Sequence, residues 1–414
     1  MCTQNDSTKI YFYGIMDSQR HLSSRFALKT LVILLIYLFT TTKDNHLYSQ
    51  DQCSRKVSLL TCTPGSELYS TFGHSAIRVK DSLVNTDIIF NYGTFDFNDP
   101  DFYEKFVKGR LLYFVSVDSL SNFLMEYEYF NRGVTEQVLN LDCASIDKLV
   151  AALYENAKEE NRYYLYDFTH DNCTTRLRDM LENVSGKNLQ TKNIIPAAGT
   201  SFRDMIHEYL DRGGQYWSKL GIDILLGSPL DRNVTNREAM FLPDYLFKAF
   251  DSSTVNGERL VSAKNQLLPA PVNNRSTGFF SPVVVMTIFL IIIAVASYFW
   301  KQRAFLKAFD VFFFGVLGML GILLLFMWFG TNHPMCRNNL NLLWALPTHL
   351  PLAIMLFIPK KWVRSYFRVI FFFSLVLAVA WFFLPQEMNR ALLPVLGIII
   401  IRSYSISDQK NRYA

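Results

Sequence analysis

The sequence predicts an α+β domain outside the cytoplasm, followed by an all-α membrane domain of five helices. Two observations lead to this fold class. Charged residues occur throughout residues 43–275 of the 414-residue chain, whereas residues 280–401 are almost entirely apolar. A further apolar segment lies near the start of the chain and follows several basic residues. Because runs of about 20 apolar residues are long enough to cross a bilayer, we expect an exported domain joined to a membrane.

The first apolar segment extends from Phe26 to Thr40 and follows Arg20 and Arg25. A basic stretch before an apolar core is typical of an export signal or an uncleaved anchor. We therefore predict a cytoplasmic tail or n-region over residues 1–25 and a signal peptide or signal anchor over residues 26–42. No clear cleavage site of small residues follows, so the sequence leaves both alternatives open.

The membrane domain is predicted over residues 280–402, before a cytoplasmic tail at 403–414. Its breaks near Lys301, Lys360 and Arg402 are basic, and the other breaks are less so. Since basic loops remain in the cytoplasm, the charges place the domain before the spans on the outer side. The expected spans are 280–300, 309–330, 340–358, 367–384 and 390–402.

The net charge of +5 does not indicate a nucleic-acid partner, because most of the excess Lys and Arg residues flank apolar spans. The chain contains no zinc-ligand spacing and no glycine-rich phosphate loop. We therefore expect no metal, no cofactor and no nucleic acid.

The chain has six cysteines, of which Cys2 is expected in the cytoplasm or in a removed segment. The other five would face the oxidising side, and an odd number leaves at least one thiol unpaired. Cys53 and Cys62 are close enough in sequence to form a bridge. The pairing among Cys53, Cys62, Cys143 and Cys336 stays open, because connectivity does not follow from spacing.

The outer domain is predicted over residues 43–250 as a mixture of strands and helices. Four segments have strand composition, and Pro64 and Gly65 form a turn after the first. Two helices are expected at 146–160 and from about Asn172 to Gly186, where apolar residues recur at helical spacing. The predicted strands are 57–62, 75–79, 87–92 and 111–117. Residues 251–279 lack periodicity and are predicted to be a linker.

Cys173 is the candidate nucleophile, because it falls in the first turn of a predicted helix. The positive end of a helix dipole favours a thiolate, and so does a neighbouring histidine. The alternative is a small buried apolar residue or half of a disulfide. Cys143 is not favoured, because it falls at the predicted end of a strand.

His74 and His170 are the two candidate bases. His170 lies three residues before Cys173, and a residue there tends to point away from the first turn of the helix. His74 lies on a predicted strand and can approach Cys173 from outside the helix, so we favour His74, although His170 is not excluded. Asn91 follows on the next strand and is a candidate to orient the imidazole.

Four further residues are candidates for substrate binding. Arg78 and Arg176 have the charge to bind a phosphate or carboxylate, but each is equally suited to a surface ion pair. His333 and Asn338 belong to an outer loop that is unusually polar for this apolar half of the chain. That loop is expected either to shape a substrate entrance or to be a solvated turn.

Six short runs in the sequence resemble one family, the lipoprotein N-acyltransferase of Bacteroidota known as Lnb. The likeness covers nearly the whole chain beyond residue 55. Four runs lie in the outer domain and two in the membrane half: Leu59–Gly65, Phe72–His74, Asn91–Phe97, Asp171–Arg176, Thr331–His333 and Asn341–Trp344.

In this resemblance the histidine precedes the cysteine. That order is similar to circularly permuted papain-like folds, such as the lecithin:retinol acyltransferase group and NlpC-type hydrolases. The resemblance implies a permuted papain-like α+β periplasmic domain followed by the five-helix transmembrane domain. It also implies a bacterial inner membrane location, with the catalytic domain on the periplasmic side.

The same resemblance implies a reaction. Cys173, with His74 as base and Asn91 as its partner, would take an acyl chain from a phospholipid as a thioester. The α-amine of a diacylglyceryl-cysteine lipoprotein would then accept the chain. The alternatives are a membrane-bound cysteine hydrolase (a phospholipase, thioesterase or cell-wall peptidase) and a non-catalytic module that binds lipoproteins or peptides. The donor lipid, the acyl position, internal transfer and the oligomeric state stay open.

Overall fold

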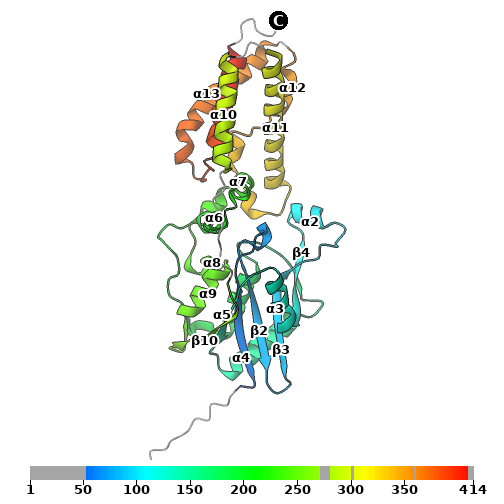
Figure 1. Ribbon diagram of the computed structural model, residues 1–414, viewed down its shortest axis with the longest axis vertical. Helices are drawn as coiled ribbons and strands as arrows, with labels where there is room; N and C mark the ends of the chain where they lie inside the picture. Colours follow the sequence, from blue (N-terminus) through cyan, green and yellow to red (C-terminus); the bar gives the residue numbers. More distant parts are fainter. Residues whose placement is uncertain (1–52, 271–279, 300–302, 359, 409–414) are drawn as a thin grey trace, which may run out of the picture. The chain divides into compact units, whose positions relative to one another are not determined.

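The computed structural model describes residues 53–270, 280–299, 303–358 and 360–408 (Figure 1). The predicted tail at 1–25, the export segment at 26–42 and Cys2 lie outside the described residues, as do 271–279 of the predicted linker and the end of the C-terminal tail.

A seven-stranded antiparallel sheet forms the centre of the first domain, in the order β10-β5-β1-β2-β3-β4-β6. Its strands are β1 Arg55–Cys62, β2 His74–Asp81, β3 Thr86–Thr94, β4 Leu112–Ser119, β5 Val134–Leu139, β6 Tyr163–Leu165 and β10 Val261–Leu268. The strands predicted from composition at 57–62, 75–79, 87–92 and 111–117 are thereby confirmed. Every residue from Val57 to Cys62 is buried, because elements cover both faces of β1.

Helices pack on the sheet. Helix α5 lies against β2 and β3, α4 and α9 contact β1, and α3 contacts β3 and β4 (Figure 1). Phe123 and Tyr127 of α3 form one apolar cluster with Leu60, Cys62 and Ala76 of the strands. The helices of this domain are α2 Phe102–Lys108, α3 Leu120–Tyr129, α4 Cys143–Asn156, α5 Cys173–Ser185, α6 Phe202–Arg212, α7 Tyr216–Leu225, α8 Asn236–Ala239 and α9 Pro243–Ser252.

Two predictions about this domain were wrong. Residues 251–268 are not a linker: β10 pairs with β5, and β8 (Thr254–Val255) and β9 (Glu258–Arg259) join β7 (Leu189–Gln190) in a second sheet. Most side chains of β10 are exposed, so main-chain pairing holds this edge strand and leaves little apolar pattern in its sequence. Cys143 does not end a strand but opens α4, where Asp142 caps the helix by accepting from the backbone of Ser145.

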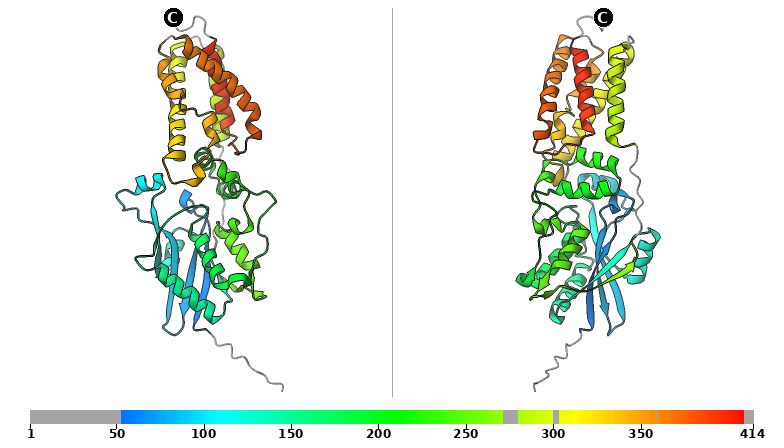
Figure 2. Two further views of the ribbon diagram at one scale, coloured as in Figure 1. Left: turned by 180° about the vertical axis from the view of Figure 1, so that it is seen from behind. Right: turned by 60° about the vertical axis from the view of Figure 1, so that its left-hand side comes forward.

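The membrane half has three described helices that are long and apolar enough to cross a bilayer. They are α10 Pro282–Phe299, α11 Arg303–Phe329 and α13 Lys361–Ala380 (Figure 2). Five continuous spans are therefore not confirmed. The predicted span at 340–358 is broken into η5 (Leu340–Leu343) and α12 (His349–Met355), and the last is α14 (Leu392–Ser407), of 16 residues.

The break before α12 has a local cause and a matching partner. Pro347 cannot donate a backbone hydrogen bond, so a continuous helix is disfavoured there. Gly318 and Gly321 of α11 allow the broken segment to approach: a Cβ at these positions would lie 2.2 Å from Leu350 N and 2.1 Å from Ala345 O. Small residues commonly permit such close packing in membranes.

The loops at the outer ends of the membrane helices are bonded to the end of α7. Asn341 donates to the backbone oxygen of Asp223 at 2.8 Å, and Asn389 donates to the Asp223 carboxylate at 2.8 Å. Gly227 donates through its backbone to Met335 O at 2.7 Å. The predicted outer loop that contains His333 and Asn338, and the loop that contains Asn389, therefore both contact the first domain.

Candidate active site

Cys173 is the first residue of α5, and Asn172 fixes the start of this helix. The Asn172 side-chain oxygen accepts from the backbone N–H groups of Thr174 and Thr175 at 2.9 and 2.8 Å. Its side-chain nitrogen donates to the backbone oxygens of Phe168 and Phe241 at 2.7 and 2.8 Å. Asn172 is buried, so this cap holds the helix start, and Cys173 with it, firmly against two other segments.

His74 reaches Cys173 from the first position of β2. Its Nε2 lies 2.6 Å from Asn91 Oδ1 on β3. Because an amide oxygen only accepts, Nε2 carries the hydrogen and Nδ1 is left for the thiol of Cys173, to which the imidazole is hydrogen-bonded. The register that pairs Ile77 with Phe90 puts His74 and Asn91 on one face of the sheet. Cysteine, histidine and asparagine thus form one hydrogen-bonded chain.

Electrostatic interactions favour ionisation of both Cys173 and His74. Burial by itself raises the pKa of Cys173, but the charge of His74 and hydrogen bonds from His74, Thr174 and the Ser75 backbone lower it to about 7. For His74, burial lowers the pKa, but the Cys173 thiolate and the Asn91 hydrogen bond outweigh this and raise it. The side chains can therefore exist as thiolate and imidazolium near neutral pH.

Gly93 leaves space beside the two reactive side chains. Its φ is +90°, and a Cβ there would lie 3.7 Å from Cys173 Cβ and 4.0 Å from His74 Cε1. The pairing of β3 with β4 shifts register between Asn91 and Thr94, so the irregularity directly follows the asparagine. Such bulges commonly re-aim a strand next to an active site.

The other cysteines in the described part of the chain lack this environment. Cys53 and Cys143 are disulfide-bonded. Cys62 is a free, fully buried thiol opposite His74 in the β1–β2 ladder, so no bridge joins it to Cys53. Burial raises the pKa of Cys62 to about 12 and that of Cys336, also free, to about 11.

His170 is not brought to the thiol. Its Nδ1 is 2.7 Å from Thr169 Oγ1 and 3.4 Å from Asp167, and its exposed ring lies beside Phe202. Of the two histidines considered, the structure brings only His74 into contact with Cys173.

The two candidate arginines are engaged in ion pairs. The guanidinium of Arg78 binds Asp87 and Glu136 and is largely buried. That of Arg176 binds Asp171 at 2.6 Å and lies 3.6 Å from the centre of the Tyr164 ring. The structure therefore favours a structural interpretation for both residues over a substrate contact.

His333 and Asn338 lie between the two halves of the protein. Nε2 of His333 is 3.1 Å from the backbone oxygens of Phe106 and Val107, at the end of α2. Asn338 has φ of +49°, and its backbone oxygen accepts from Ser228. Neither side chain is brought to Cys173 by a described contact.

A row of aromatic rings beside Cys173 was not anticipated. Tyr166 is partly buried and interacts with the charge of Cys173, and the ring of Tyr113 stacks on it with 4.3 Å between the ring centres. The ring centre of Phe95 lies 5.1 Å from that of Tyr113 and 5.8 Å from that of Phe102 in α2. The density of aromatic residues over 95–106 is the only sequence signal for this row, which leads from the thiol to α2.

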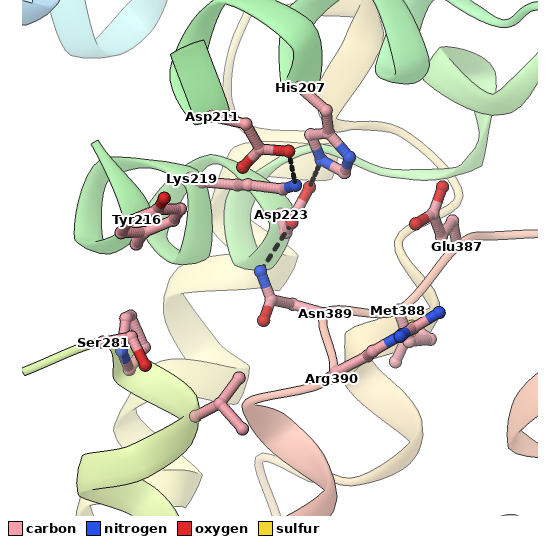
Figure 3. Close-up of a pocket in the computed structure, with 12 residues that line it drawn as sticks. His207, Asp211, Tyr216, Lys219, Asp223, Ser281, Glu387, Met388, Asn389 and Arg390 are labelled. Carbon is pink, nitrogen blue, oxygen red and sulfur yellow. Dashed lines mark hydrogen bonds and ion pairs between the residues drawn. The ribbon is translucent and has the colours of Figure 1, made fainter. Parts of the chain in front are cut away.

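A separate cavity of about 320 Å³ lies where α6 and α7 meet the start of α10 and the loop at 387–390 (Figure 3). It includes none of Cys173, His74 and Asn91. Its lining is His207, Asp211, Tyr216, Lys219, Asp223, Ser281, Pro282, Val283, Glu387, Met388, Asn389 and Arg390.

Comparison with known families gives two matches that together cover most of the chain. Residues 43–210 match the Lnb N-terminal periplasmic domain, and residues 274–412 match the Lnb transmembrane domain. No curated protein and no solved structure matches the chain.

Proposed function

Because this chain belongs to the Lnb family and is a membrane protein with a periplasmic domain, we propose that it N-acylates lipoproteins through a thioester on Cys173. The donor is a phospholipid, and the acceptor is the α-amine of a diacylglyceryl-cysteine. The observation that carries this proposal is the chain of Cys173, His74 and Asn91, in which the thiol has a pKa of about 7.

The first half-reaction uses the ionised pair. The Cys173 thiolate attacks an ester carbonyl of the phospholipid and forms a C–S bond. The tetrahedral oxyanion then collapses, the C–O bond breaks, and the lysophospholipid alkoxide takes the proton of His74. The backbone N–H of Cys173 is one of the donors that a helix start leaves without an intrahelical acceptor, so we assign it to the oxyanion.

The second half-reaction reverses the roles. The neutral α-amine of the lipoprotein attacks the thioester carbonyl, and His74 accepts the proton that the amine loses. The C–S bond breaks, Cys173 returns as thiolate and the amide product leaves. Since both substrates react at one thiol in turn, ping-pong kinetics are expected.

Transfer requires that water be kept from the thioester. Cys173 is 8% exposed, and the partly buried ring of Tyr166 beside it begins the aromatic row that runs to α2. This apolar surrounding supports transfer to an amine over hydrolysis.

Contacts of α2 support a substrate that comes from the membrane. The backbone of Asn332 donates to Lys108 O at 2.9 Å, directly after α11 ends, and Tyr103 and Phe106 of α2 are exposed. Exposed aromatic side chains next to a transmembrane helix are typical of the lipid headgroup level. The aromatic row therefore offers a path for an acyl chain from the bilayer to Cys173.

We also propose five crossings of the bacterial inner membrane. The broken segment around α12 supports the third crossing: it starts at the outer loop after α11, and Phe357 beyond its end lies under Lys307, 5.4 Å away, near the start of α11. The segment thus runs the length of α11 in reverse. Helix α14 contacts α10 and α13 and supplies the fifth crossing.

The proposal is tested with the purified full-length protein, a phospholipid with labelled acyl chains and a synthetic diacylated lipopeptide. The expected product is lipopeptide that carries the label on its α-amine, together with lysophospholipid. Cys173→Ala and Cys173→Ser should abolish the product, whereas Cys62→Ala, which removes a neighbouring buried thiol, should retain it. Release of free fatty acid without any labelled amine would instead identify a hydrolase. Unchanged acylation in both Cys173 variants would show that Cys173 is not the nucleophile.

A further inference from the structure

The cavity beside α7 contains two opposite charges that are not neutralised. Lys219 is paired with Asp211 at 2.7 Å, and His207 with Asp223 at 2.8 Å (Figure 3). Among the residues that the structure describes, the side chains of Glu387 and Arg390 have no hydrogen-bond or ion-pair partner, although both line the same cavity. A site whose built-in pairs are complete but which keeps one free anion and one free cation is suited to a ligand with both charges.

The cavity lies at the start of the transmembrane helix α10, where lipid headgroups are expected. Its floor includes Pro282 and Val283, the first residues of the transmembrane helix α10. Just before them, the exposed Phe280 accepts through its backbone oxygen from the indole N–H of Trp217 at 3.0 Å. Aromatic residues gather at this boundary between water and hydrocarbon.

The same elements connect the cavity with the candidate active site. Tyr209 of α6, between the cavity residues His207 and Asp211, has its ring 5.9 Å from Phe72, two residues before His74. Gln215, at the start of α7, donates to Ser66 O at 2.9 Å. A lipid held by its headgroup in the cavity is therefore presented next to a helix that contacts Phe72, just before the strand of His74.

We propose that this cavity binds the headgroup of a zwitterionic phospholipid that has a phosphate and a primary ammonium. Arg390 receives the phosphate, Glu387 receives the ammonium, and Val283 and Met388 contact the glycerol and the first methylenes. This assignment rests on the proposed function, since it names the class of lipid that serves as acyl donor.

The charges also explain why a purely anionic lipid fits less well. A headgroup with only a phosphate would satisfy Arg390 but leave Glu387 unpaired next to it. A free phosphate ion would lack the apolar contacts as well. The site thus selects between lipids through the charge that it would leave unmatched.

The test measures lipid retention by native mass spectrometry of the full chain carrying Cys173→Ala, loaded with equal amounts of phosphatidylethanolamine and phosphatidylglycerol. We expect phosphatidylethanolamine to be retained preferentially. Because both side chains are exposed, Arg390→Ala should lower retention of both lipids by about three- to tenfold. Glu387→Gln should lower only phosphatidylethanolamine and remove the preference. Arg337→Ala is the matched control, since it removes an exposed outer-loop arginine that does not line the cavity.

Equal retention in Arg390→Ala and its parent, or an equal loss in Arg337→Ala, would overturn the headgroup site. So would a preference that persists in Glu387→Gln. Because the chain used is inactive, lipid retention does not depend on acyl transfer. If the Arg390 and Glu387 variants change lipid retention as expected but the wild-type protein transfers no acyl chain, the proposed function is wrong and the headgroup site stands. If the wild-type protein transfers acyl chains but the variants retain lipid unchanged, the headgroup site is wrong and the proposed function stands.

Discussion

Two free thiols lie near His74, and their environments differ at the level of single contacts. Cys62 and Cys173 are both buried, and burial raises the pKa of each. Only Cys173 has a hydrogen bond from the imidazole and a place at a helix start, and only its pKa falls below that of a free thiol. The difference between a reactive cysteine and an inert one is therefore made by a few donors.

Alkylation should distinguish these thiols. With iodoacetamide, Cys173 should react first, and its rate should rise about a midpoint near pH 7, because the thiolate is the nucleophile and its pKa is about 7. Cys62 and Cys336, with pKa values of about 12 and 11, should stay largely unmodified below pH 8. Peptide mapping of alkylated protein over a pH series gives both measurements. A Cys173 rate that still climbs above pH 9 would contradict the lowered pKa.

Asn91 has a positioning role in this account, since it touches His74 and not the thiol. Asn91→Ala should lower kcat by about 10², because the imidazole loses its fixed orientation. The pKa of Cys173 should rise in parallel, which a merely structural role would not produce. The alkylation profile reports that shift, and Asn91→Gln serves as the conservative variant. Wild-type kcat and an unshifted profile in Asn91→Ala would argue against the role.

At the scale of elements, the helix start at Cys173 was predicted correctly, because Asn172 and Gly186 are ordinary cap residues in an apolar pattern. The same signal did not single out this cysteine, since Cys143 also opens a helix. What separates them is His74, which comes from a strand 99 residues earlier in the chain. Such a contact depends on sheet register, which local sequence does not specify.

Asn172→Ala tests whether the cap also tunes the thiol. The variant loses two accepted and two donated hydrogen bonds, so we expect about 1–2 kcal/mol less stability. Loosening the helix start should also raise the pKa of Cys173. Thermal unfolding and the alkylation profile measure the two effects. Ser119→Ala, at the exposed cap of α3, is the control that should lower stability without a pKa change.

Two features that the sequence interpretation missed occur where side-chain burial does not determine the structure. The edge strand β10 is held by main-chain bonds to β5 and has mostly exposed side chains, so it resembled a linker. The segment at 340–358 is apolar enough for a span, but Pro347 and the close approach to Gly318 and Gly321 break it. Hydropathy measures the transfer of side chains from water to the bilayer. Neither the main-chain pairing of β10 nor the helix break at Pro347 depends on that quantity.

At the scale of the whole molecule, Asp223 joins the outer domain to the membrane domain. Its carboxylate, which is fully buried, accepts from Arg203, His207 and Asn389, each at 2.8 Å. Burial raises the pKa of Asp223, but His207, Arg203 and Asn389 outweigh it and leave the pKa lowered. Removing this carboxylate while its buried partners remain would leave a buried charge uncompensated, which strongly destabilises a folded protein.

Asp223→Ala should therefore destabilise the full chain in detergent by about 3 kcal/mol, whereas Asp211→Ala, which breaks an exposed pair, should cost less than about 1 kcal/mol. The pKa of Asp223 is lowered in the folded state. Its contribution to the free energy of unfolding is therefore complete above the ordinary carboxyl pKa of about 4, and it is lost as the pH falls from there through the lowered folded pKa. Thermal unfolding at pH 7 and at a pH well below 4 measures both. Equal losses in the two variants would remove the special role of Asp223.

The central claim is that Cys173 carries the acyl chain, and its most direct test is to trap that intermediate. The purified protein is incubated with phospholipid in the absence of lipopeptide, digested, and analysed by mass spectrometry. We predict that the Cys173 peptide gains the mass of one acyl chain, that hydroxylamine removes it, and that added diacylated lipopeptide removes it with formation of an N-acylated product. A Cys173 peptide that stays unmodified while N-acylated lipopeptide accumulates would contradict the account.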